Sequence, residues 1–353
     1  MATIREKSKG QWQVQIRRKG WPFQSGTFRT RKEAQAWARK TESEMDRGLF
    51  VDQTAARETT LADLIHAYIE GVTEHRHSEN ARVSERLRLE RFLRTETELC
   101  SYYIINLRPE HFEAYRDRRL KQQVSRGNNT SVTRKTIAPS TVKRELNLLK
   151  RVIDYRRRWL GIQLNPVNAQ DVKRPTVQDE RDVRLSDEER EALMQACREA
   201  RNRLLAPFVE LGFETGARRG NLLRLEWTDV KLKQGTALLR GMKNSRNPDK
   251  IINHTIGLSP RAVEILKALP RTEARVFPMT SNAMRKAFNY ARKKAGLTHF
   301  RFHDTRHERI SSLFEAGWQM PQVMAQSGHR DPKSVMRYTN LSGDYLAKQL
   351  AKL

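Results

Sequence analysis

The chain has 353 residues, and its 68 lysine and arginine side chains against 41 acidic ones give a net charge of +27 and a pI of about 10.5. Apolar residues make up 37% and charged residues 31%, and the most apolar stretch, 204–213, is far shorter than the ~20 residues that span a bilayer, which argues against a membrane protein. The two cysteines, Cys100 and Cys197, are too far apart for a metal knuckle and are typical of a reducing compartment, so we expect a cytosolic protein.

The positive charge is clustered as well as large. Residues 1–32 contain nine basic side chains and a single acid, Glu6. An excess of one sign is repulsive within a compact fold, so it is usually kept where a polyanion is bound. A basic surface that only keeps the protein soluble is the alternative, but the clustering favours nucleic acid as the partner.

The first fifty residues predict a small β-rich module. Residues 12–16 alternate apolar and polar, the period of a strand with one buried face, and 21–28 are expected to form the return strands with Gly26 as a kink or second turn. Thr30 with Glu33 forms a capping box that begins a helix. Three strands and one helix can lay a basic sheet into a DNA groove, although a basic hairpin without a ligand has the same pattern. The basic residues near the turns are Arg17, Arg18, Lys19, Arg29 and Arg31.

The middle of the chain is predicted to be helical. After a linker, Thr60 begins a helix, and further helical stretches cover 83–93, 109–121 and 140–159. The last of these is apolar on one side and basic on most of the rest, which suits a helix that packs on a bundle while lying along phosphates. Its candidate DNA-binding residues are Lys143, Arg144, Lys150 and Arg151.

A second boundary follows. The polar stretch 170–184 lacks periodicity and is interpreted as an interdomain linker, and Ser186 with Glu189 caps the helix that opens the C-terminal domain. That domain is predicted to be helical, interrupted by one β-like region in which 236–242 and 251–258 flank a polar turn.

Three short strings carry the chemistry. The first is Thr-Gly-Ala-Arg-Arg-Gly-Asn at 215–221, the second is His-Asp-Thr-Arg-His at 303–307, and the third is Ser-Gly-His at 327–329, followed nine residues after the histidine by Tyr338. Each string alone is a weak signal. The sequence contains no phosphate loop of the P-loop type, no His-Glu-x-x-His and no Cys/His zinc spacing, so we expect neither a metal nor a cofactor.

In this order and spacing the three strings resemble the tyrosine recombinase family, which includes phage integrases. That family has an arginine in a Thr-Gly-x-Arg turn, a lysine on a β-hairpin, a His-x-x-Arg string, a histidine or tryptophan, and then a tyrosine. The match runs from about residue 184 to the C-terminus, and 303–341 looks close to the branch of shufflon recombinases. The N-terminal segment looks like the arm-binding module of integrases, and the middle segment resembles the core-binding domain by position and type.

The resemblance implies a mostly α fold with small β elements in a three-domain architecture. The expected parts are an arm-binding-like module with its linker at 1–57, a helical core-binding domain at 58–169, a linker at 170–184 and a catalytic domain at 185–353. It also implies double-stranded DNA as the substrate, at a core site and at a second arm-type or flanking site. A homotetramer on two DNA sites in the bacterial cytosol or nucleoid is expected, with no membrane contact, and an amphipathic tail helix at 344–353 is expected to dock on a neighbouring protomer.

By the same resemblance, six residues take the active-site roles: Arg218, Lys243, His303, Arg306, His329 and Tyr338. The tyrosine oxygen attacks a DNA phosphorus and expels a 5′-hydroxyl, leaving a 3′-phosphotyrosine bond. The two arginines hold the non-bridging oxygens, because planar guanidinium groups bind them bidentately. Lys243 protonates the leaving oxygen, His303 helps to remove the tyrosine proton, and His329 hydrogen-bonds the phosphate.

The sequence departs from the family pattern at three places. An acidic residue is usual where Asn221 stands, and leucine is usual at Thr305 and before Gly-His, where Ser327 stands. None of these changes removes a reactive group. Lys250 lies on the same predicted loop as the proposed lysine, so either could be the acid, and His307 is interpreted as a structural histidine.

Two other functions remain open from the sequence. A type IB topoisomerase uses related chemistry but relaxes supercoils as a monomer, without defined sites or an arm module. A non-catalytic DNA-binding regulator could share the basic modules but has no use for the full set of six residues. The sequence also leaves open the DNA target, the choice among integration, excision and inversion, and whether a host DNA-bending protein takes part.

Overall fold

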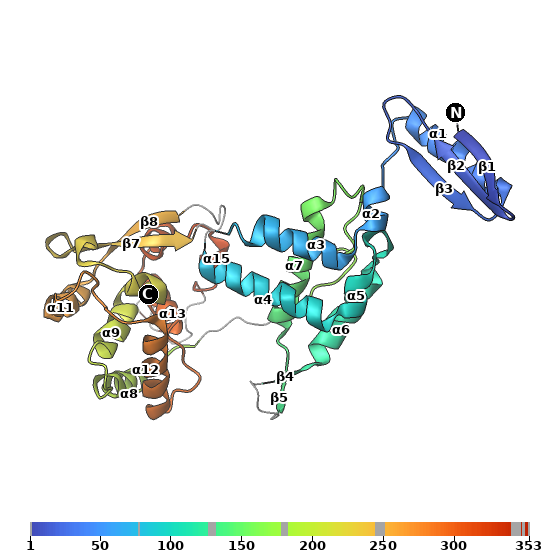
Figure 1. The fold of residues 1–353 in the computed structure, drawn as a ribbon. Coiled ribbons are helices and arrows are strands. Elements are labelled where there is room, and N and C mark those ends of the chain that lie inside the picture. The colour runs from blue at the N-terminus through green and yellow to red at the C-terminus, as the bar shows by residue number, and fades with distance from the viewer. Residues whose placement is uncertain are drawn as a thin grey trace. The chain divides into compact units, whose positions relative to one another are not determined.

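The structure is a computed structural model that describes residues 2–76, 78–125, 132–177, 183–243, 251–339, 347, 350 and 351. It divides into two compact units, Met1–Asp179 and Glu180–Leu353 (Figure 1). Helices predominate, beside three small antiparallel sheets of three, two and three strands, so the predicted fold class is confirmed. Within these ranges, no helix is long and apolar enough to cross a membrane.

The N-terminal module is a three-stranded antiparallel sheet with one helix. Strands β1 (Ala2–Ser8), β2 (Gln11–Ile16) and β3 (Gln24–Phe28) follow each other in the sheet, and helix α1 (Arg31–Asp46) packs on one face. The predicted Thr30–Glu33 capping box is present. The placement of the strands was partly wrong: residues 2–8 form a strand, and Gly26 pairs with Val14 in the middle of β3 instead of making a turn.

The rest of the first unit is a helical bundle with its own core. Its elements are α2 (Thr54–Glu58), α3 (Leu61–Tyr68), the π-helix Ile69–Thr73, α4 (Glu79–Thr95), α5 (Thr97–Ser101), the 3-10 helix Ile104–Asn106, α6 (Pro109–Lys121), β4 (Gln123–Ser125), β5 (Val132–Thr136) and α7 (Pro139–Arg156). Helix α7 packs against α3 and α6 through the predicted apolar side, which contains Leu146, Leu149 and Ile153. The β4–β5 hairpin was not predicted, because strands of three and five residues leave almost no alternation to detect.

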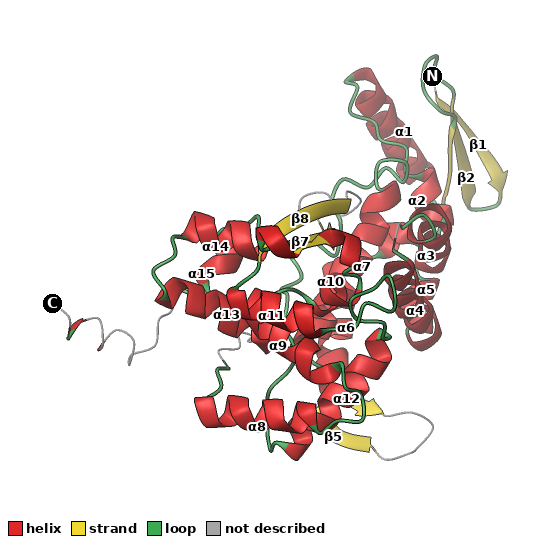
Figure 2. Cartoon of the chain, turned by 90° about the vertical axis from the view of Figure 1, so that its left-hand side faces the viewer, coloured by secondary structure: helices red, strands yellow, loops and turns green. Residues whose placement is uncertain are grey.

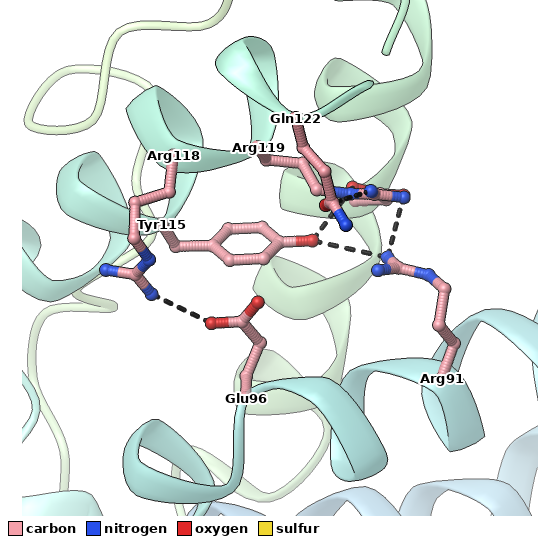
Figure 3. Close-up of polar contacts among 7 residues, drawn as sticks. Arg91, Glu96, Tyr115, Arg118, Arg119 and Gln122 are labelled. Atoms are coloured by element: carbon pink, nitrogen blue, oxygen red, sulfur yellow. Dashed lines mark hydrogen bonds and ion pairs between the residues drawn. The ribbon is translucent and has the colours of Figure 1, made fainter. Parts of the chain in front are cut away.

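One acid of α7 is buried. Glu145 is only 5% exposed. Its two carboxylate oxygens accept hydrogen bonds from Arg91, Arg119 and the Tyr115 hydroxyl, at 2.8 to 3.1 Å, and Figure 3 shows these donors converging from α4 and α6. Burial and the charge of Glu145 raise the pKa of Tyr115, so its hydroxyl keeps the proton that it donates. Glu145 therefore ties three helices together.

The second unit is helical with one three-stranded sheet (Figure 2). Its elements are α8 (Asp187–Arg198), α9 (Leu205–Thr215), α10 (Arg219–Leu223), the 3-10 helix Trp227–Asp229, β6 (Val230–Lys231), the 3-10 helix Leu232–Gln234, β7 (Thr236–Lys243), β8 (Ile251–Gly257), α11 (Pro260–Ala268), α12 (Ser281–Lys294), α13 (Asp304–Glu315), α14 (Met320–Ser327) and α15 (Lys333–Met336). The Ser186–Glu189 capping box is present. The predicted tail helix at 344–353 lies outside the described residues apart from 347, 350 and 351, and so does 178–182 of the predicted linker.

Helices α9 and α13 pack closely at the centre of this unit. A Cβ on Gly212 of α9 would lie 2.9 Å from the ring of Phe302 and 3.2 Å from Oγ1 of Thr305, so only glycine allows this approach. The Phe302 ring packs on Phe208 of α9, with 5.1 Å between ring centroids. This contact fixes the start of α13, which carries the second string, against the end of α9, which carries the first.

Candidate active site

The first string forms a tight turn after α9. Gly216 ends the helix in the left-handed conformation, with φ of 62°, and a Cβ there would lie 3.2 Å from Cβ of Arg309. Thr215 is buried, and its hydroxyl donates to the Leu211 carbonyl and accepts from the Ala217 N–H. The turn places Arg218 at the start of α10.

Arg306 connects the first and third strings from the first turn of α13. Its side chain is 3% exposed, and it donates to the carbonyl oxygens of Gly216 and Ser327, each at 2.7 Å. A guanidinium group has five N–H donors, so these two bonds leave donors for a ligand. One of its nitrogens, Nη2, also lies 3.2 and 3.3 Å from the two ring nitrogens of His329.

The third string orients His329. Helix α14 ends at Gly328, with φ of 71°, and the chain then reverses so that the Ser327 hydroxyl lies 2.7 Å from Nδ1 of His329. The serine therefore contacts both Arg306, through its carbonyl, and His329, through its side chain. In the sequence Ser327 stands out only as a departure from the family pattern; its position two residues before the histidine is the signal that could have identified it.

Tyr338 is packed beside the histidines. It is 6% exposed and belongs to a small apolar cluster with Ile310 and Val323. Its ring centroid lies 5.0 Å from that of His307 and 6.1 Å from that of His329, while His307 lies 5.4 Å from His303. His307, interpreted from the sequence as structural, thus contacts the rings of both the proposed base and the proposed nucleophile.

Burial and, after it, the neighbouring cations set the protonation of this cluster. Burial, and then the charges of Arg306 and Arg218, lower the pKa of His329 to about 3. Desolvation, then His307 and Arg306, lower the pKa of His303 to about 4. Burial and the charge of Arg218 lower the pKa of Arg306 to about 9, so the guanidinium stays charged at neutral pH while both imidazoles are neutral.

The Tyr338 phenol responds to two opposing effects. Burial raises its pKa, and the charges of Arg306, Arg337 and Arg218 lower it, with burial the larger effect. The phenol therefore holds its proton at neutral pH. A neutral imidazole nearby is a suitable acceptor for that proton.

The β7–β8 hairpin carries the proposed lysine. Lys243 is the last residue of β7 and pairs with Ile251 of β8; its side chain, and the whole of Lys250, lie outside what the structure describes. The Gln326 side chain donates to the Gly257 carbonyl at 2.8 Å and accepts from the Gly257 N–H at 2.9 Å, which fastens β8 to the helix preceding His329.

Asn221, where an acid was expected, has a clear position. It is 4% exposed, and its amide nitrogen donates to the Arg240 carbonyl of β7 at 3.1 Å. A carboxylate cannot make this bond without a proton, because it has no N–H to donate. The amide thus links α10 to the hairpin in this chain.

The candidate DNA-binding residues lie on the first unit and do not form part of this cluster. In the N-terminal module, Arg18 pairs with Asp46, whereas the guanidinium groups of Arg17 and Arg31 lie over the rings of Phe23 and Trp12 at 5.3 and 5.5 Å. Lys19 and Arg29 are exposed.

The basic residues of α7 divide in the same way. Lys150 pairs with Asp154, and Arg151 pairs with Glu85 at 3.1 Å. Lys143 and Arg144 are exposed. In the described part of the chain, no hydrogen bond, ion pair or ring contact engages Lys19, Arg29, Lys143 or Arg144, so their charge is directly available to a phosphate.

Comparison with known proteins places this site in a family. Residues 183–344 match the phage integrase family. A shufflon-specific DNA recombinase of Escherichia coli is 34% identical over 239 residues, 67% of this chain and 58% of that protein. A putative integrase/recombinase of Haemophilus influenzae is 28% identical over 361 residues, covering 98% of this chain and 88% of that protein. The chain belongs to the phage integrase family of tyrosine recombinases.

A solved structure extends the likeness to the fold of nearly the whole chain. A lambda integrase tetramer bound to a Holliday junction has a TM-score of 0.61 and 18% identity, and the match covers 96% of this chain and 94% of that one. At this identity the likeness is one of fold. It includes the N-terminal module as well as the two helical parts, in agreement with the multi-domain architecture implied by the sequence.

Proposed function

We propose that this protein is a site-specific DNA recombinase that cuts and rejoins DNA strands through a 3′-phosphotyrosine intermediate. The observation that carries the proposal is the convergence of Tyr338 with two guanidinium groups and neutral imidazoles, from strings more than a hundred residues apart in sequence. Membership of the tyrosine recombinase family supports it. The Arg306 side chain, with two bonds to the backbone, is held in place before a substrate arrives.

In the proposed mechanism the Tyr338 oxygen attacks a backbone phosphorus, and the bond from phosphorus to the 5′-oxygen breaks. His303 accepts the phenol proton, and Lys243 gives a proton to the leaving 5′-oxygen. Arg218 and Arg306 stabilise the charge that grows on the non-bridging oxygens as the phosphorus becomes five-coordinate. The new ester keeps the energy of the phosphodiester, so a second 5′-hydroxyl can reverse the step.

The organisation of the chain supports binding to more than one DNA segment. We propose an arm-type DNA-binding module at 1–57, a core-binding domain at 58–169, a linker at 170–184 and a catalytic domain at 185–353. The separate apolar core of the N-terminal module supports the first boundary. A homotetramer on two DNA sites, in the bacterial cytosol or nucleoid, is the assembly we propose, by analogy with the lambda integrase tetramer.

A suicide duplex, nicked near the cleavage point, tests the proposal. The wild-type protein should form a covalent adduct with the 3′ end of the cleaved DNA strand. It should form this adduct equally well in excess EDTA. Tyr338→Phe removes one oxygen, so it should bind the duplex as the wild type does and form no adduct. An adduct that persists in Tyr338→Phe, or that the chelator abolishes in the wild type, would overturn the mechanism. Relaxation of any supercoiled plasmid, without site preference, would instead indicate a topoisomerase.

A further inference from the structure

A cavity of about 540 Å³ lies beside the candidate active site, within the second unit. It is an open cavity bordered by the turn after α9, the start of α10, one side of α12 and the segment that precedes α13. Its polar lining includes Arg218, Arg219, Arg285, Arg292, Arg301 and His303. Arg218 and His303 belong both to this cavity and to the proposed catalytic cluster.

The lining has the chemistry of a site for a phosphate ester. Five of the lining residues are arginines, and none is an aspartate or glutamate, as far as the described residues go. The floor is apolar, because Met284, Phe288 and Phe302 are buried beneath the arginines. Cations around an apolar floor suit a group with a charged phosphate and a less polar sugar.

Besides Arg218, two of these arginines differ from the remaining pair, Arg285 and Arg292. Arg285 donates to the Asn282 side chain at 2.9 Å. Arg292 is committed to the protein: it donates to the Phe300 carbonyl at 2.9 Å and to Asn289, which shapes the end of α12. For Arg219 and Arg301, the described part of the chain offers the guanidinium group no hydrogen bond or ion pair. A charged group without a protein partner on a cavity wall is available to a ligand.

We infer that this cavity binds the nucleotide next to the attacked phosphate, with Arg219 and Arg301 holding its own phosphate. The inference rests on the proposed function, because it places the attacked phosphate on Arg218. Phosphates along one DNA strand rise by about 3.4 Å per nucleotide, so the neighbouring phosphate must lie close to the first. The cavity begins at Arg218, and the arginines inside it are where that neighbour falls.

Charge removal without a cleavage reaction is the first test. Arg219→Gln and Arg301→Gln should each weaken binding of a DNA duplex about tenfold and reduce the slope of log affinity against log salt by about 1. The matched control is Lys293→Gln, which removes one positive charge from an exposed position of α12 that does not line the cavity. If the two arginine variants bind like the control, the inference is wrong, whether or not the protein cleaves DNA.

An uncharged linkage locates the contact. The probe is a suicide duplex with one methylphosphonate beside the cleaved phosphate, on the 5′ or the 3′ side. At one of these two positions the methylphosphonate should weaken binding of the duplex by the wild type about tenfold relative to unmodified DNA. Arg301→Gln or Arg219→Gln, which has already lost this contact, should bind the modified and unmodified duplexes almost equally. Equal further losses in wild type and variants would overturn the assignment. Absence of any wild-type adduct on unmodified DNA would count against the proposed function instead, and the binding comparison would still decide the cavity's role.

Discussion

Glu145→Gln offers a direct measure of how the first unit is held together. The substitution keeps the shape of the side chain but removes the charge that faces Arg91 and Arg119 and replaces one acceptor oxygen by an N–H donor. The Arg119 side chain is 9% exposed and cannot turn to water, whereas that of Arg91 is 24% exposed and partly can. Removing one partner of a buried ion pair costs about 3–5 kcal/mol. Because Arg91 can regain water, we expect a value near the lower limit, about 3 kcal/mol.

Urea unfolding of the full chain, with hydrogen exchange followed in peptides of α6 and α7, measures this loss. Glu90→Gln is the matched control: Glu90 pairs with Arg86 at 3.8 Å on the surface of α4, with both side chains about half exposed. Exposed pairs contribute less than about 1 kcal/mol, so the control should change little. If the backbone amides of α6 and α7 are protected from exchange equally well in Glu145→Gln and in the control, the buried carboxylate does not hold these helices.

Three further outcomes follow from the second unit. Arg306→Ala should slow adduct formation by about 10²–10³-fold, because it loses one donor to the transition state, and rapid single-turnover cleavage measures this directly. The pKa values of His303 and His329, about 4 and about 3, lie below the ~6.5 of an unfolded histidine. The stability that depends on their neutral forms is therefore complete above pH ~6.5 and declines as pH falls toward 4 and below. The Tm should drop over that pH interval, and it should drop less steeply in His329→Gln. An equal dependence of Tm on pH in the two proteins would contradict the reasoning. Gly216→Ala should destabilise the unit by about 1–2 kcal/mol, since alanine must adopt φ of 62° with its Cβ near Arg309, and a Tm equal to that of the wild type would count against it.

The helix starts could be predicted from sequence because their causes are local. The capping boxes of Thr30, Thr60 and Ser186 each join residues three apart, and each is present. The apolar side of α7 follows from a period of 3.6 residues in the same way. Such signals need no knowledge of what packs nearby.

Other features depend on partners that are distant in the chain. Nothing within α7 shows that Glu145 is buried, because the arginines that bind it come from α4 and α6. The same holds for Arg306: spacing singles it out, but the carbonyls that fix its side chain lie 90 residues before it, at Gly216, and 21 residues after it, at Ser327. Sequence patterns could propose the reactive groups, whereas the bonds that orient them needed the tertiary structure.

The ligand-free site keeps positive charge on its guanidinium groups and none on His303 or His329. Because the pKa of His303 lies at about 4, its ring is neutral at neutral pH and has a lone pair for a proton, while Tyr338 keeps its own proton owing to burial. In the proposed mechanism a bound phosphodiester brings negative charge, which offsets the field of Arg218 and Arg306 and raises the pKa of both imidazoles. His303 then becomes a stronger base at the moment when the phenol must lose its proton. In this mechanism the cations, which add to burial in depressing the pKa values of His303 and His329 without DNA, also make the basicity of the site depend on a bound phosphate.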